Sequence, residues 1–268
     1  MQQETYPSLT VSIVVFKPDF NLLQKVLQHL KKALTQETLI QAKITIVNNG
    51  PEAQELEQLV HRSSLKIKLI NNLQNTGYGA ANNLVLLDSN AHYHLILNPD
   101  ALLAPDALKV GLSYLESHTE VGLVCPQILN PDGTRQFVHR LHPTLFDMFL
   151  RSFAPHWLQQ IYRQRMQRFE LRHLDWEQVQ DIPSPSGCCM LARTSVLKTV
   201  GGFDPRYFLY YEDSDLGRKI LAHAKIKYLP NFKVTHIWAR AARKSWRMKW
   251  IMIHSGILYL WKWGGWLR

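Results

Sequence analysis

Cysteine is scarce in this sequence, whose 268 residues include only Cys125, Cys188 and Cys189. Three cysteines, two of them adjacent, provide neither a disulfide framework nor a metal-ligand spacing, so we expect a reducing compartment. No apolar run reaches the roughly 18 residues that a membrane-spanning helix needs. The first residues lack the basic-then-apolar plan of a secretory signal, so we expect none. A hydrophobic content of 46% with 19% charged residues is typical of a folded globule rather than a disordered chain.

Acidic residues are absent after Asp215, although the whole chain carries a net charge of +10. From His236 onward, seven Lys and Arg are interleaved with six of the eight tryptophans. This mixture favours an anionic membrane surface, where indole rings lie among headgroups and cations meet phosphates. A packed helix with a solvated basic face is the alternative. The composition would also suit nucleic acid, which we do not expect as a partner. Residues 237–268 are therefore predicted to form a basic, Trp-rich helix that contacts a membrane.

The first 125 residues alternate between strand-like and helix-like patterns. Apolar runs typical of buried strands occupy 10–16, 43–47, 66–70, 93–97 and 121–125. Helical patterns separate them at 20–34, 55–60, 80–87 and 106–115. This alternation predicts an α/β fold with a Rossmann-like, mainly parallel sheet. Ligands of such sheets bind at the carboxyl ends of the strands, where Phe16, Asn48, Asn71 and Asn98 fall.

Residues 126–236 are less regular. We expect helix across 143–180, a short buried strand at 188–192, a helix at 212–222 and two strands after it. We interpret 1–125 and 126–236 as two halves of one domain.

Two acidic motifs and one histidine suggest the chemistry. Asp100 ends the motif Leu97–Asp100 after a strand, where it could cap a helix or anchor a divalent cation. Glu212, Asp213 and Asp215 crowd together, either because a helix N-terminus favours acids or because one of them acts as a base. Arg218 could pair with Asp215 on that helix. His236 is a core histidine or a late metal ligand.

Two glycine-containing segments complete the motifs. The segment 75–83 lies between a strand and a helix, so it is either an ordinary capped loop or a phosphate-binding loop. It is neither G-x-G-x-x-G nor a Walker loop. Gly201–Asp204 is a tight turn that could also allow a substrate to approach closely.

Taken in order, these segments resemble the family 2 glycosyltransferases of the GT-A fold over nearly the whole chain. The motifs that carry the resemblance are Val11–Val15, Ile46–Asn49, Asn75–Gly79 with Asn82 and Asn83, Leu97–Asp100, Gly201–Asp204, and Tyr211–Leu216 with Arg218. The set is most similar to bacterial rhamnosyltransferases of O-antigen and related polysaccharide assembly. Asn48 stands where family members commonly have an Asp, and Phe16 and Lys17 replace the more usual Tyr-Asn. These departures leave the choice of nucleotide open.

The resemblance implies that 1–125 is the nucleotide-sugar-binding half, that 126–236 is the acceptor-binding and catalytic half, and that the C-terminal helical region lies on the acceptor side. It also implies a role for each matching residue. Asp213 is expected to be the catalytic base with Glu212 beside it, and Asp100 and His236 to hold Mg²⁺ or Mn²⁺. Residues expected to bind the nucleotide sugar are Phe16, Asn48, Asn49, Asn75, Gly77, Tyr78, Asn82, Asn98 and Asp100. Residues expected on the acceptor side are Gly187, Gly202, Asp215 and Arg218.

The activity implied is an inverting, metal-dependent transfer of a sugar from a nucleotide donor to a hydroxyl. The donor expected is dTDP-rhamnose and the acceptor a lipid-linked or lipopolysaccharide saccharide, at the inner face of the bacterial cytoplasmic membrane. The alternatives are a UDP-hexose-dependent transferase, a metal-dependent hydrolase and a non-catalytic module that binds sugar nucleotides.

Overall fold

One mixed sheet organises the computed structural model of the protein, which describes residues 8–35, 41–72, 74–237 and 246–266. The strands follow the order β3-β2-β1-β4-β8-β6-β9-β5, with β7 paired to β9. Their bounds are β1 Ser8–Val15, β2 Gln41–Asn48, β3 Ile67–Asn71, β4 Tyr93–Leu97, β5 Ala101–Leu103, β6 Val121–Leu129, β7 Gln180–Asp181, β8 Cys189–Arg193 and β9 Lys225–His236. Strands β1 to β4 are parallel, while β8 is antiparallel to both β4 and β6.

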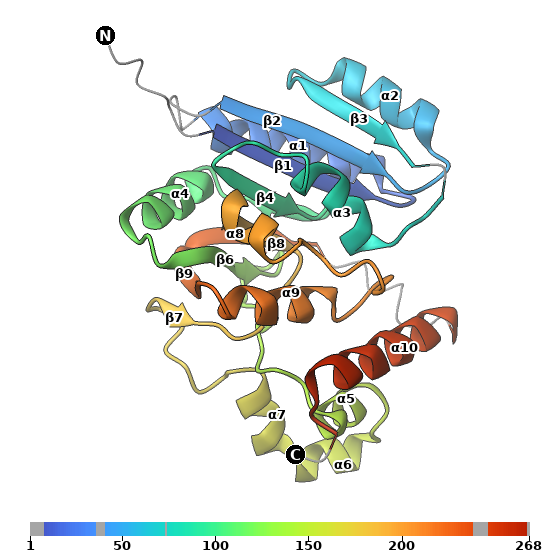
Figure 1. Ribbon diagram of the computed structural model, residues 1–268, viewed down its shortest axis with the longest axis vertical. Helices are drawn as coiled ribbons and strands as arrows, with labels where there is room; N and C mark the ends of the chain where they lie inside the picture. The colour runs from blue at the N-terminus through green and yellow to red at the C-terminus, as the bar shows by residue number, and fades with distance from the viewer. Residues whose placement is uncertain (1–7, 36–40, 73, 238–245, 267–268) are drawn as a thin grey trace.

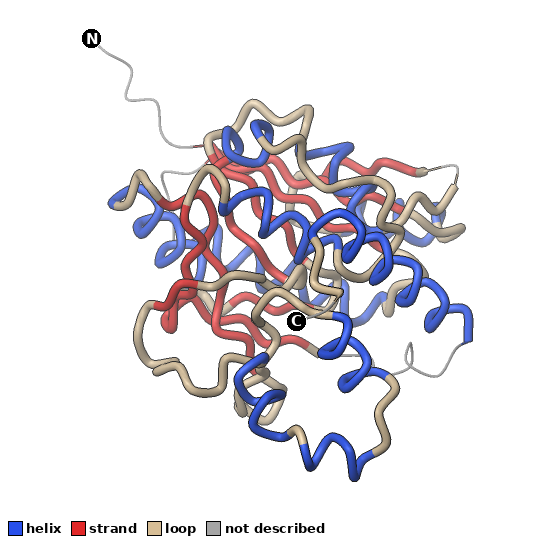
Figure 2. The backbone as a smooth tube through the Cα atoms, turned by 60° about the horizontal axis from the view of Figure 1, so that its bottom comes forward, coloured by secondary structure: helices blue, strands red, loops and turns tan. Residues whose placement is uncertain are grey.

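Helices cover both faces of this sheet. Their bounds are α1 Phe20–Thr35, α2 Ala53–Arg62, α3 Tyr78–Leu86, α4 Ala107–Ser117, α5 Leu145–Ser152, α6 His156–Ile161, α7 Arg163–Phe169, α8 Thr194–Thr199, α9 Glu212–Leu221 and α10 Trp246–Trp263. Figure 1 shows α3, α8 and α9 in front of the sheet and α1 behind it. Helices α5, α6, α7 and α10 gather below the sheet edge as a separate lobe, which Figure 2 brings forward.

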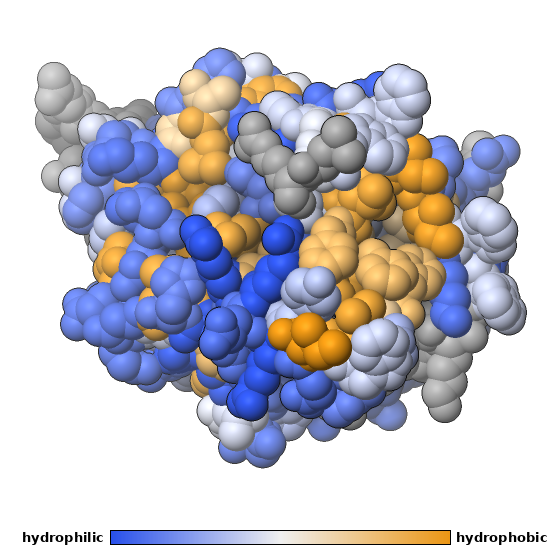
Figure 3. Space-filling model, turned by 90° about the horizontal axis from the view of Figure 1, so that it is seen from below, coloured by the Kyte–Doolittle hydropathy of each residue, from blue (hydrophilic) through white to orange (hydrophobic). Residues whose placement is uncertain are grey.

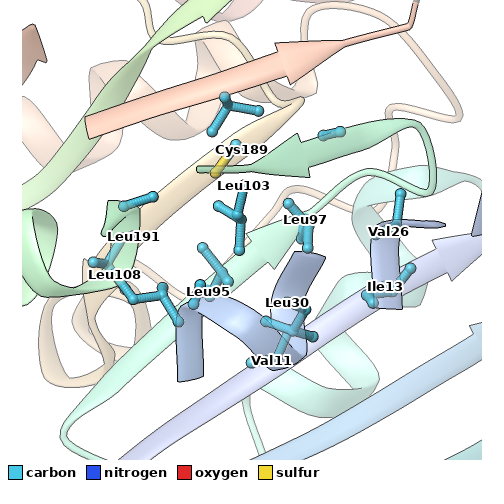
Figure 4. Packing of buried hydrophobic residues seen from close by; sticks show 14 of the residues in the cluster. Val11, Ile13, Val26, Leu30, Leu95, Leu97, Leu103, Leu108, Cys189 and Leu191 are labelled. Carbon is cyan, nitrogen blue, oxygen red and sulfur yellow. The ribbon is translucent and has the colours of Figure 1, made fainter. Parts of the chain in front are cut away.

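Strand alternation sends side chains to two cores. Val11, Ile13, Leu95 and Leu97 face α1, where Leu30 is fully buried against them (Figure 4). The intervening positions point to the opposite core beneath α8 and α9; its buried members include Ile96, Leu123, Met190, Leu197, Leu216 and Ile220. Both faces of the central strands are thus covered, which explains why these strands read as continuous apolar runs.

The α/β fold and its mainly parallel sheet confirm the prediction, but three details differ. The stretch 143–180 is not one helical region: α5, α6 and α7 are short, and 170–179 lie outside any helix. Pro155 prevents α5 from continuing, and Leu171 takes a left-handed backbone with φ of 55° just after α7. The two strands expected after α9 are one long strand, β9, since a register shift against β6 accommodates Pro230. The sequence pattern also missed β5 and α8, which are very short.

The predicted C-terminal helix is present as α10, although residues 238–245 of that prediction lie outside the described part of the chain. Among the described helices, none is long and apolar enough to cross a membrane. The divisions expected after residues 125 and 236 stay predictions, and β6 continues through the first of them.

Candidate active site

A pocket of about 430 Å³ lies where the sheet meets the lower lobe. Six residues expected at the site line it: Tyr78, Asn98, Gly187, Glu212, Asp213 and His236. Other parts of its wall come from the loop 138–143, from α5 and from α10. The pocket therefore joins the carboxyl end of β4, the start of α9 and the lower lobe in one cavity, as expected for a ligand site in an open α/β sheet.

Asp100 and His236 meet because their backbones are paired. Asp100 precedes β5, which runs antiparallel to β9 with Ala101 opposite His236. The Ile237 N–H donates to the Asp100 carbonyl at 2.9 Å and continues this pairing. As a result, His236 Nε2 lies 3.2 Å from Asp100 Oδ1, even though the two residues are far apart in sequence.

Gln136 determines how the His236 ring faces the carboxylate. Its Nε2 donates to the His236 carbonyl at 2.8 Å, which turns its Oε1 toward His236 Nδ1 at 3.2 Å. This contact favours the tautomer with the proton on Nδ1 and leaves the lone pair of Nε2 directed at Asp100. In that tautomer His236 Nε2 and Asp100 Oδ1 are two acceptors that face each other, and a cation between them would join them.

The polar atoms around this pair fit a divalent cation. Asp100 Oδ1 and Asn98 Oδ1 are buried and accept no hydrogen bond from the described residues; Asp100 Oδ1 has only its 3.2 Å contact with His236 Nε2. Carboxylate and amide oxygens with an imidazole nitrogen suit Mg²⁺ or Mn²⁺. No cluster of three or more His, Cys, Asp and Glu occurs within the described ranges. Two such side chains suffice for an ion that shares its remaining coordination with water and the phosphates of a ligand.

The acidic pair is placed by an unusual turn before α9. Tyr210 and Tyr211 both adopt left-handed backbone conformations, with φ of 71° and 64°. Such strain in residues other than glycine is concentrated at functional sites. Helix α9 then begins at Glu212, so Glu212 and Asp213 lie in its first turn, where the helix dipole favours negative charge.

Glu212 and Asp213 differ in their surroundings. Glu212 is buried, and its Oε2 has no hydrogen-bond partner in the described residues. Burial and then the neighbouring Asp213 carboxylate raise the pKa of Glu212 to about 8. Glu212 therefore keeps its proton at neutral pH and is a poor proton acceptor there. Asp213 is the better candidate for the base.

Asp213 is oriented by hydrogen bonds to both carboxylate oxygens. Oδ2 accepts from the Gly187 N–H at 3.0 Å, and Oδ1 accepts from the Ser214 N–H at 2.7 Å. The Gly187 carbonyl in turn accepts from the Tyr78 hydroxyl at 2.8 Å. Three residues expected at the site, Tyr78, Gly187 and Asp213, thus form one continuous hydrogen-bonded path across the pocket.

Three of the asparagines expected to bind the nucleotide, Asn48, Asn49 and Asn82, lie at the end of β2 and in α3, outside the pocket lining. Asn48 donates to Asn71 at 3.0 Å, and Asn49 donates to the Gly77 carbonyl at 3.0 Å. Asn82 accepts from Ser12 at 2.7 Å and is fully buried. These amides bond to the protein itself, so they build the edge beside the pocket.

Phe16, Asn75 and Gly77 belong to the same edge. Phe16 is half-exposed at the end of β1, and Asn75 accepts from the Gly77 N–H at 3.0 Å. Gly77 has a φ of 89°, and a Cβ there would lie 2.3 Å from the Phe208 carbonyl oxygen. The glycine at position 77 therefore allows the start of α3 to pack closely against the 203–211 segment. This structural role is one of the two alternatives that the sequence left open for the glycine-rich segment.

Three residues expected on the acceptor side lie elsewhere. Asp215 is fully buried and accepts from Trp263 Nε1 at 2.6 Å and from Lys262 at 3.0 Å. Arg218 donates to the Trp263 carbonyl at 3.2 Å, so the expected Asp215–Arg218 pair is replaced by bonds from both residues to α10. Gly202 accepts from Lys219 behind α9. Asp215 and Arg218 thus anchor the C-terminal helix α10, Gly202 contacts α9, and the pocket lining includes none of the three.

The sequence analysis missed three basic residues that line the pocket: Arg140, Arg151 and Lys249. Burial and then repulsion from Arg151 lower the pKa of Arg140 to about 9. The only sequence signal was the general basic character of the region after residue 135, which does not separate pocket residues from surface residues.

The fold matches solved glycosyltransferases of the GT-A class. The structure of GalNAc-T7 with UDP, GalNAc and Mn²⁺ superposes with a TM-score of 0.66 at 14% identity, covering 88% of this chain and 44% of that one. The mannosyltransferase PcManGT from Pyrobaculum calidifontis, in complex with GDP-Man and Mn²⁺, superposes with a TM-score of 0.62 at 16% identity, covering 90% and 60%. The chain thus spans less than two thirds of the length of either solved structure.

The family follows from the sequence comparison. Residues 7–250 match the model described as "Glycosyltransferase like family 2", so the chain belongs to glycosyltransferase family 2. It is similar to the N-acetylglucosaminyl-diphospho-decaprenol L-rhamnosyltransferase of Mycobacterium tuberculosis, at 26% identity over 228 residues, or 78% of this chain and 71% of the relative. It is also similar to the rhamnosyltransferase WbbL of Escherichia coli K12, at 28% identity over 172 residues, or 60% of each chain.

Proposed function

We propose that this glycosyltransferase moves L-rhamnose from dTDP-rhamnose to a hydroxyl of a saccharide linked to a lipid or to lipopolysaccharide. The observation that carries the proposal is a single pocket lined by both Asp213 and His236, whose ring faces the Asp100 carboxylate at 3.2 Å. Similarity to two rhamnosyltransferases, one of them named for a lipid diphosphate acceptor, supports the choice of sugar and acceptor class.

The reaction is a single displacement with inversion at the anomeric carbon. Asp213 removes the proton from the acceptor hydroxyl, and the oxygen attacks the carbon from the face opposite the nucleoside diphosphate. Gly187 and Ser214 hold the Asp213 carboxylate in place, since each donates to one of its oxygens. Asp100 and His236 would hold Mg²⁺ or Mn²⁺, which would stabilise the negative charge on the departing diphosphate. Because burial raises the pKa of Glu212, this residue keeps its proton at neutral pH and adds no second negative charge beside Asp213.

A donor screen tests this proposal. The purified protein is incubated with membrane extract and either dTDP-rhamnose or a UDP-hexose, and the product is isolated and its linkage analysed. Transfer of rhamnose alone supports the proposal, whereas transfer of a hexose from UDP would assign the other donor. Hydrolysis of either donor without a glycosylated product would indicate a hydrolase, and binding without turnover a non-catalytic module.

We also propose that the lower lobe lies on the inner face of the cytoplasmic membrane. Large apolar side chains are exposed on α5, α6 and α10: Phe149, Phe153, Trp157, Ile161, Trp246, Trp250, Ile257 and Trp261. Figure 3 views the molecule from below and shows apolar residues gathered beside strongly hydrophilic ones on this side. Exposed aromatic rings among basic residues are typical of interfacial binding.

Vesicle sedimentation tests the membrane contact. Replacing Trp157, Trp250 and Trp261 with Ser should reduce binding to vesicles that contain anionic lipid. The matched control replaces Leu84 and Leu87, which are exposed on the α3 side, and should leave binding unchanged. Equal binding by the triple Trp variant and the unaltered protein would contradict the proposal.

A further inference from the structure

The pocket has a basic wall that the transfer step described above does not use. Arg140 lies in the loop after β6, Arg151 in the last turn of α5, and Lys249 in α10. Asp147 in the same wall is already engaged, because it accepts from Thr144 at 2.6 Å and pairs with Arg165 at 2.6 Å. The cations of this wall therefore exceed the acidic charge that Asp147 provides.

Arg140 is the most constrained of the three. Its backbone exchanges two hydrogen bonds of 3.1 Å with Ser184, which fixes the residue against the loop that carries Gly187. Its Nε is buried without a hydrogen-bond partner, and its guanidinium lies over the Phe169 ring at 6.0 Å. None of the carboxylates in the described ranges forms an ion pair with it within 4.0 Å. A partly buried guanidinium whose Nε has no partner is stabilised by an anion that enters the pocket.

The position of Arg140 relates this wall to the reaction centre. Arg140 and Asp213 line the same pocket and are close enough for the Asp213 charge to affect Arg140. Met148, Ser152 and Met252 line the same pocket and belong to the helices that carry Arg151 and Lys249. Those helices also carry exposed aromatic side chains, such as Phe149 and Trp250. One pocket therefore contains the candidate base, a cationic wall and apolar side chains, which suits a molecule with a saccharide, an anionic link and an apolar tail.

We propose that Arg140, Arg151 and Lys249 bind the phosphate or diphosphate group that links the acceptor saccharide to its lipid. This inference rests on the proposed function, because it assigns the acceptor's anionic group to that same pocket. The planar guanidinium forks of two arginines suit phosphate oxygens, and Lys249 adds a point charge at the side of α10. The Asp100–His236 pair is left for the donor diphosphate, so two phosphate sites serve the two substrates.

Binding calorimetry with geranyl diphosphate tests the assignment without requiring turnover. The protein is first saturated with dTDP and Mg²⁺ so that the donor site is occupied. We expect geranyl diphosphate to bind, geraniol to bind far more weakly, and inorganic pyrophosphate to bind through the same residues with lower affinity. The Arg140→Gln variant should lose roughly 10- to 100-fold in affinity for geranyl diphosphate, as expected for a lost charged hydrogen bond.

Matched variants make the result decisive. Arg163→Gln alters an exposed arginine of α7 outside the pocket and should leave binding unchanged. Arg140→Lys should retain part of the affinity, because it keeps the charge without the fork. Arg151→Gln and Lys249→Gln should each weaken binding, and they decide the question if Arg140→Gln does not fold.

Three results would overturn the inference. The first is equal affinity for geranyl diphosphate in the unaltered protein and in the Gln variants of all three residues. The second is equally tight binding of geraniol. The third is a matching loss of dTDP affinity in these variants, which would assign the cations to the donor. The binding assay is independent of the donor screen: the proposed sugar transfer fails if no rhamnose is transferred, even where Arg140-dependent binding of the diphosphate remains.

Discussion

The two edges that border the pocket treat their polar groups in opposite ways. At the end of β2 and the start of α3, buried asparagines find their partners within the protein. Asn48 donates to Asn71, and Asn49 donates to the Gly77 carbonyl and accepts from Asn72. On the other edge, Asn98, Asp100 and Glu212 have buried oxygens that no described residue satisfies. Because buried groups without partners are costly, such atoms are concentrated where chemistry requires them. We therefore expect the first edge to act as a scaffold and the second as the reactive surface.

The largest effect expected from this contrast is the loss of activity in Asp213→Asn. The amide retains the shape of the side chain but takes up no proton, so transfer should fall by about 10²–10⁴-fold while donor binding persists. Steady-state rates and donor calorimetry measure the two effects separately.

The companion variant on the scaffold edge is Asn49→Ala. Loss of its hydrogen bonds to Gly77 and Asn72 should lower the free energy of unfolding by about 1–3 kcal/mol while leaving turnover per folded molecule nearly unchanged. Full activity in Asp213→Asn, or a collapse of turnover in folded Asn49→Ala, would break the distinction between the edges.

The second expected effect concerns the cation. EDTA should suppress transfer, and Mg²⁺ or Mn²⁺ should restore it, because Asp100 and His236 present a carboxylate and an imidazole lone pair to one point. Asp100→Asn should raise the concentration of metal required for half-maximal activity by at least roughly 10-fold. Unchanged turnover in chelator would remove the cation from the mechanism.

The third effect is on stability and tests the assignment of Asp215 to the anchor of α10. Asp215→Ala removes the acceptor of Trp263 Nε1 and one partner of Lys262, so the free energy of unfolding should fall by about 2–4 kcal/mol. Urea denaturation measures this change. Asp88→Ala, an exposed acidic residue, is the control and should change stability by less than about 0.5 kcal/mol. A similar small change in both variants would contradict the anchor.

The smallest effect is a pH dependence due to Glu212. Its pKa is raised from about 4.5 to about 8 in the folded protein, so the folded state binds more protons than the unfolded state between these values. Stability contributed by this group is therefore lost as pH rises through that window. Glu212→Gln should match the unaltered protein near pH 5 and exceed its stability by about 1–2 kcal/mol near pH 8.5. Parallel stability curves across this range would show that Glu212 does not titrate there.

Sequence reasoning succeeded where the relevant interactions are local. Apolar runs and helical periodicity predicted the alternating elements, and strand ends predicted the edge where Asn98 and Asp100 lie. It could not show that β5 pairs with β9, which is what brings His236 to Asp100. That contact depends on strand pairing between residues more than a hundred positions apart.

The position of Asp215 outside the pocket lining has a simple geometric reason. Successive residues of an α-helix are rotated by about 100°, so Asp213 and Asp215, which are two positions apart in the acidic motif, project to opposite sides of α9. Asp213 faces the pocket and Asp215 faces α10. The basic wall was missed for a related reason: composition gives the number of cations but not which of them face inward.

The pairing of β5 with β9 also affects the stage of synthesis at which the protein is expected to bind its donor. Asp100 and His236, the two side chains expected to hold the metal, lie more than a hundred positions apart in the sequence, and the pairing of β5 with β9 brings them together. During synthesis, a chain that has emerged only to the end of β8 carries Asp100 but not His236. We therefore expect binding of a metal–nucleotide complex to require a chain in which the last strand of the sheet is in place.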